Sequence, residues 1–100
     1  MAPVPPPAAA RLRGSLVRLA DALNAAHVDA ATADALFTDH RVEDPSGRPI
    51  EGFEAARWER VSVGRREGSW ALRDLDGRVL ATLRLGAPKP TQWRVQLFDP

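Results

Sequence analysis

Apolar residues recur at helical spacing near the start of the chain. The intervals within this series are four, three, four and three residues, which places its members on one face of an α-helix. The series consists of Leu12, Leu16, Leu19, Leu23 and Ala26. It predicts a helix over residues 8–26 whose apolar face packs on a core.

A second helix is expected directly after the first. Asp29 is a favourable N-cap, and Val28 before it is suited to act as a hydrophobic staple. Ala33, Leu36 and Phe37 then supply a core face. We expect this helix to end near residue 38 or 39.

Strand signals dominate the last third of the chain. Asp76-Gly77 is a strong signal for a two-residue hairpin turn. The register set by this turn brings the flanking apolar residues onto one face of the hairpin, in agreement with their alternation. The expected pairs are Leu75 with Arg78, Asp74 with Val79, Leu72 with Ala81, and Trp70 with Leu83. A last strand is expected over residues 92–99.

Turn signals divide the middle of the chain into short pieces. We expect a strand over residues 40–44, a turn over residues 45–47 and an extended piece over residues 49–51. Gly52 then precedes a third helix over residues 53–61. This order of elements predicts an α+β fold in which three helices pack on a curved, mostly antiparallel sheet.

Length and composition narrow the class of protein. The 100 residues fit one domain, in which residues 1–7 are a disordered proline-rich tail and residues 8–100 the folded part. The absence of Cys excludes a disulfide framework, and with only two His residues a structural zinc site is not expected. No cofactor is expected either. The net charge of +1 favours neither nucleic acid nor a membrane as partner. With no spanning apolar run and no secretory signal, we expect a cytoplasmic protein.

Asp44 is the residue with the clearest chemical potential. In a strand over residues 40–44 it shares the inner face with His40 and Val42, so its carboxylate would lie at the mouth of the core. Desolvation there should raise its pKa and suit it to act as a general base. The alternative is that Asp44 only caps the turn before Pro45, which is a common role of Asp. Spacing alone leaves both interpretations open.

Three stretches carry a resemblance to a known family: LNAAHVD at residues 23–29, ALFTDHRVEDP at residues 35–45 and IEGFEAAR at residues 50–57. They resemble the nuclear transport factor 2-like superfamily, and within it the SnoaL-like and ketosteroid isomerase group. Members fold as an α+β cone whose sheet wraps around a pocket. The resemblance implies that this chain is a shortened member of the superfamily.

The resemblance also implies a site and a ligand. Asp44 matches the general base of the group by position, with His40 or Asp74 as assisting residues, and the ligand would be a hydrophobic small molecule. The implied lining of the pocket consists of Leu19, Val42, Phe53, Trp70, Leu72, Trp93 and Val95. A homodimer is expected as well, formed through the outer sheet face that carries Arg73, Leu80, Thr82, Arg84, Gln96 and Phe98.

Three functions follow from these features. The chain is a non-catalytic domain for ligand binding or association, or a cofactor-free isomerase, cyclase or hydrolase, or an unrelated module that binds protein or nucleic acid through its arginine-rich second half. Isomerases of the group use a tyrosine at the position of Leu19, and this chain has no tyrosine. One missing oxyanion donor costs roughly 3–4 kcal/mol of transition-state stabilisation. This loss and the short sheet favour the binding domain, and the modest charge disfavours the third function.

Overall fold

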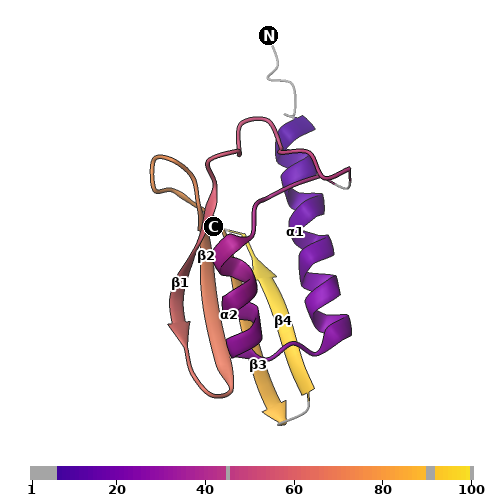
Figure 1. The fold of residues 1–100 in the computed structure, drawn as a ribbon, viewed down its shortest axis with the longest axis vertical. Coiled ribbons are helices and arrows are strands. Elements are labelled where there is room, and N and C mark those ends of the chain that lie inside the picture. The colour runs from indigo at the N-terminus through magenta and orange to yellow at the C-terminus, as the bar shows by residue number, and fades with distance from the viewer. Residues whose placement is uncertain (1–6, 45, 90–91, 100) are drawn as a thin grey trace.

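The computed structural model describes residues 7–44, 46–89 and 92–99. Two helices are followed by four strands that form one antiparallel sheet in the order β1-β2-β3-β4 (Figure 1). The elements are α1 (Pro7–Ala26), α2 (Ala30–Asp39), β1 (Arg57–Val63), β2 (Glu67–Arg73), β3 (Val79–Lys89) and β4 (Gln92–Phe98). The α+β fold is therefore confirmed, with two helices in place of the expected three. The expected tail lies outside the described residues, except for Pro7, which begins α1.

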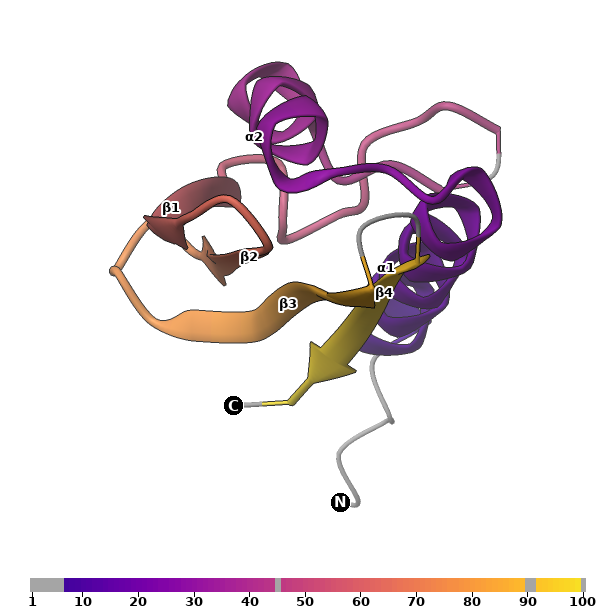
Figure 2. The ribbon, with the colours of Figure 1, turned by 90° about the horizontal axis from the view of Figure 1, so that it is seen from below.

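The two helices lie against different parts of the sheet. α2 lies over β1 and β2, and α1 runs along β4 (Figure 2). Asp29 caps α2 as expected, because its carboxylate accepts a hydrogen bond of 2.8 Å from the backbone N–H of Thr32. Within the described residues, neither helix has the length and apolar character that a crossing of a membrane requires.

Two apolar clusters fill the space between the helices and the sheet. The first lies beneath α2 and the second half of α1, and the second lies beneath the first half of α1 and the connector of residues 40–56. The buried members of the first cluster are Ala20, Leu23, Ala30, Ala33, Phe37, Trp70, Leu83, Leu85, Ala87, Trp93 and Val95. The buried members of the second are Leu12, Leu16, Val42, Ile50, Ala56, Leu72 and Ala81.

The helical core faces follow the expected pattern except at Leu36 and at Ala26, the last member of the α1 series, which is exposed. Leu12, Leu16 and Leu23 of α1 are buried, and Phe37 of α2 packs with its ring centroid 4.8 Å from that of Trp70. Full burial of such an aromatic side chain contributes about 1.5–3 kcal/mol. Leu36 was expected in the same core face but is 53% exposed, so that expectation is wrong.

The expected third helix over residues 53–61 is also wrong, because most of this stretch belongs to β1. Arg60 faces the helices from β1, where its guanidinium binds the carboxylate of Asp34 in α2 with an Nε–Oδ1 distance of 2.9 Å. The register of β1 on β2 also shifts between Arg60 and Ser62, which leaves Val61 in a bulge. A charged arginine on the helix-facing side of the strand and a bulge both break the alternation that would have indicated a strand.

The β2–β3 hairpin has the expected register away from its turn. Trp70 pairs with Leu83 and Leu72 pairs with Ala81, as the position of Asp76-Gly77 predicts. A shift beyond Leu72 then pairs Arg73, and not Asp74, with Val79. The turn is correspondingly longer than two residues, and the expected pairs of Leu75 with Arg78 and Asp74 with Val79 do not form.

Asn24 protects the outer edge of β4. Its side chain accepts a hydrogen bond of 2.7 Å from the backbone N–H of Val95 and donates one of 3.2 Å to the carbonyl of the same residue. These are the bonds that a neighbouring strand would otherwise make. The end of α1 therefore takes the place of a fifth strand at this point.

Candidate functional site

A cleft of about 470 Å³ opens between α1 and the segment that follows α2. Three residues of its lining, Leu19, His40 and Asp44, are among the site residues expected from the sequence. The full lining is Ser15, Arg18, Leu19, Asp39, His40, Arg41, Glu43 and Asp44. Its volume is within the usual range for small-molecule sites, although every lining residue except Leu19 is polar or charged.

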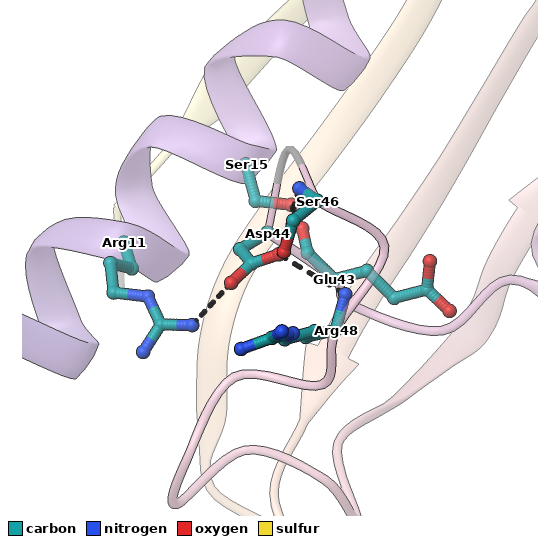
Figure 3. A network of polar contacts seen from close by, with 6 residues as sticks. All are labelled: Arg11, Ser15, Glu43, Asp44, Ser46 and Arg48. Atoms are coloured by element: carbon teal, nitrogen blue, oxygen red, sulfur yellow. Dashed lines mark hydrogen bonds and ion pairs between the residues drawn. The ribbon is translucent and has the colours of Figure 1, made fainter.

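Hydrogen bonds accepted by the Asp44 carboxylate shape the far wall of this cleft. One carboxylate oxygen, Oδ1, accepts bonds from the backbone N–H groups of Ser46 at 2.9 Å and Arg48 at 3.1 Å, and from the Ser46 hydroxyl at 2.6 Å. The other oxygen, Oδ2, lies 2.6 Å from Nη2 of Arg11 on α1 (Figure 3). The Asp44 side chain therefore fixes the turn and ties it to α1.

Asp74 forms the same turn elsewhere in the chain. Its Oδ1 accepts bonds of 2.9 Å from the backbone N–H groups of Asp76 and Arg78, and its carbonyl accepts one from Gly77. Gly47, in the turn of Asp44, and Gly77 both have a φ of 82°, a backbone conformation that favours glycine. The two turns share the sequence pattern Asp-x-x-Gly-Arg, so the turn-cap interpretation applies to both acids. Asp74 does not line the cleft.

The pKa of Asp44 is shifted in the direction opposite to the one expected. The Ser46 side chain and the Arg48 backbone N–H hold the pKa of this carboxyl far below its ordinary value, and Arg11 acts in the same direction. Desolvation, the expected cause of a raised pKa, is outweighed by these hydrogen bonds. The expectation of a raised pKa is therefore wrong, and a carboxylate of such low basicity is a poor proton acceptor near neutral pH.

His40 and Ser15 contribute the uncharged polar groups of the cleft. Burial lowers the pKa of His40, against an opposing effect from the charge of Glu43, so the imidazole is neutral at neutral pH. The ring of His40 also contacts the ring of Phe37 edge to face, with centroids 6.5 Å apart. The Ser15 hydroxyl donates a 2.7 Å hydrogen bond to the carbonyl of Glu43, which holds the two walls together.

Most of the expected pocket lining belongs to the packed core. Trp70 and Leu72 are 1% and 0% exposed, and Trp93 and Val95 lie in the first cluster with Trp70. Val42 is buried in the second cluster, and Phe53 packs against it. These six residues line neither the cleft beside α1 nor a second cleft of about 310 Å³ around Val61 on the sheet.

Arg18, Arg41 and Asp39 are cleft residues that the sequence did not single out. The sequence does contain a signal for Arg18. Ser15, Arg18 and Leu19 have the spacing i, i+3, i+4 and therefore share a face of α1. Nothing local reveals that this face meets Arg41 and Asp39. Their proximity depends on the path of the connector between α2 and β1.

Two further observations concern possible metal ligands and similarity to known proteins. Across the described ranges, no group of three or more His, Cys, Asp or Glu residues stands close enough together to hold a metal ion. A search of family models, of curated proteins and of solved structures finds no match to this chain.

Proposed function

We propose that this chain is a non-catalytic domain that binds a small molecule in the cleft between α1 and residues 39–44. The observation that carries the proposal is the cleft itself, which gathers Leu19, His40 and Asp44 in a space of about 470 Å³. Its polar lining favours a ligand with polar groups over the hydrophobic molecule expected from the sequence. Membership of the SnoaL-like group stays a prediction.

The environment of Asp44 supports binding over catalysis. Both of its carboxylate oxygens already accept hydrogen bonds from the protein, and its pKa is lowered. A general base near neutral pH needs a pKa closer to the pH at which it works. An isomerase, cyclase or hydrolase activity with Asp44, His40 and Asp74 stays the alternative prediction, as does a protein- or nucleic-acid-binding role.

Chemical-shift mapping tests the proposal. A panel of small polar fragments is titrated into the isotope-labelled chain, and we expect saturable shifts of the amides of residues 15–19 and 39–44. Amides around Val61, in the second cleft, act as an internal control and should stay unchanged. Shifts confined to that second cleft, or no shifts from any fragment, would contradict the proposal.

The turns capped by Asp44 and Asp74 have the same hydrogen-bond pattern, so they supply a matched pair of variants. Asp44→Ala removes the bonds that hold the cleft wall, so it should weaken fragment binding by about tenfold or more. Asp74→Ala removes the equivalent backbone bonds from a turn outside the cleft, so fragment affinity should stay within about twofold. Equal effects of the two substitutions on affinity would show that the wall formed by residues 39–44 is not the binding surface.

A second copy of this chain is the partner that we propose for the outer sheet face. Arg84 lies over the ring of Phe98, 5.3 Å from its centroid, and Phe98 is 40% exposed. The face also bears the ion pair of Arg73 with Glu59, so it carries both signs of charge, which allows the same patch on two copies to be complementary in charge. Leu80 was expected on this face but packs against the second core cluster beside a register shift.

Light scattering at high micromolar concentration tests this dimer. We expect twice the monomer mass for the unchanged chain and a shift toward monomer for Phe98→Asp, which places a charge in the proposed interface. Leu75→Asp is the control, because Leu75 is 85% exposed at the β2–β3 turn, away from that face. A monomer mass for the unchanged chain at every concentration would overturn the dimer.

A further inference from the structure

We infer that the ligand of the cleft is a small organic acid whose anionic group is held by Arg18 and Arg41. This inference rests on the proposed binding function and specifies the chemistry of the same site. Both arginines line the cleft and are exposed. Neither forms an ion pair with another residue in the described part of the chain. Arg18 belongs to α1 and Arg41 to the segment after α2, and guanidinium groups are well suited to bind a carboxylate or a phosphate.

The acidic residues of the lining do not pair with these two arginines. Asp44 is already paired with Arg11 through its Oδ2. The Glu43 side chain points away from α1, and this residue faces Ser15 with its backbone carbonyl (Figure 3). Asp39 and Glu43 remain, and neither forms an ion pair with Arg18 or Arg41 in the described part of the chain, so both guanidinium groups keep their donors available for a ligand.

The uncharged groups of the cleft define the rest of the ligand. Leu19 is the apolar residue of the lining and offers a contact for a small hydrocarbon body. The imidazole of His40 is neutral at neutral pH, so it can donate or accept one hydrogen bond without adding charge. Together these groups fit a compact organic anion with a short apolar part.

Three probes of similar size separate the effect of charge from the effect of shape. Phenylacetate carries the anionic group, phenylacetamide is its neutral isostere, and phenethylammonium carries the opposite charge. Each is titrated into the labelled full-length chain up to about 10 mM, with amide shifts of residues 15–19 and 39–44 as the readout. We expect phenylacetate to bind at least about tenfold more tightly than either of the other two.

Substitutions then assign the charge effect to the two arginines. Arg18→Gln combined with Arg41→Gln should remove the advantage of phenylacetate over phenylacetamide while leaving the weak binding of the amide. Arg65→Gln is the matched control, because Arg65 is exposed in the turn between β1 and β2 and does not line the cleft. It should retain the advantage of phenylacetate in full.

The outcomes distinguish this inference from the proposed function. Equal affinity for phenylacetate and phenylacetamide, or tightest binding of phenethylammonium, overturns the organic acid and leaves a small-molecule site in place. An advantage of phenylacetate that survives the double substitution overturns the assignment to Arg18 and Arg41. No saturable shift of the cleft amides with any of the three probes overturns both the inference and the proposed function.

Discussion

Replacing Gly68 with alanine tests how tightly the sheet packs beneath α2. Trp70 is two residues further along β2, on the same face, and its indole ring lies back over Gly68. A Cβ at position 68 would stand 2.4 Å from Cη2 of that ring and 3.0 Å from two further ring carbons. The added methyl group therefore forces either the ring or the strand to move.

The indole ring has little freedom to move. Its Nε1 donates a 3.0 Å hydrogen bond to Asp34, and its face packs on Phe37 at a centroid distance of 4.8 Å. Trp70 as a whole is 1% exposed. Overpacking of this kind costs about 1–3 kcal/mol, against a gain of about 0.5–1 kcal/mol from replacing a strand glycine with alanine. We expect a net loss of about 1–2 kcal/mol.

Thermal unfolding followed by circular dichroism measures this loss. For a domain of this size, about 1 kcal/mol corresponds to a fall of roughly 4–8 °C in Tm. Gly86→Ala is the matched control, because a Cβ at that position on the neighbouring strand would meet nothing within 4 Å. The control should leave Tm unchanged or raise it slightly. Gly68→Ala with a Tm equal to that of the control would refute the packing of Trp70 over β2.

Three further predictions concern the edge of the sheet, a helix end and acid stability. Asn24→Ala should cost about 2 kcal/mol of stability, since two hydrogen bonds to Val95 are lost. Faster hydrogen exchange of the Val95 amide would measure the loss of protection at this edge of β4. His27→Gly should stabilise the chain by about 0.5–1 kcal/mol in urea unfolding, because His27 directly follows the last residue of α1 and has a φ of 50°. Asp34 and Asp44 have a folded-state pKa below the ordinary value of 3.8, so their stabilisation is complete above about pH 4 and is lost as the pH falls below it. Stability that stays constant from pH 5 to pH 2 in the same assay would contradict this last prediction.

Elements with local signals could be predicted from the sequence. The apolar series from Leu12 to Leu23 is sufficient to predict α1, because side chains at helical spacing lie on one face and are buried together. Asp76-Gly77 places the β2–β3 turn, and the apolar alternation gives the strand pairing around Leu72 and Ala81, although a register shift next to the turn could not be predicted. In each case the information lies within a few residues of the element that it predicts.

Features that depend on distant partners could not be predicted in this way. Arg60 has the appearance of a surface residue until α2 brings Asp34 against it. The pKa of Asp44 follows from its turn and from Arg11, which is 33 residues away along the chain. The same reason explains the site. Leu19, His40 and Asp44 were expected, but the path of the connector is what brings Arg41 to the same cleft as Arg18.

The most direct test of a ligand site beside α1 is the measurement of nuclear Overhauser effects between a bound probe and the protein. Phenylacetate supplies the aromatic protons, and Leu19 supplies the methyl groups of the cleft. The account predicts contacts between the two, and none from the probe to the methyl groups of Val61 in the second cleft. Contacts to Val61, or to core residues such as Leu72, without contacts to Leu19 would contradict it.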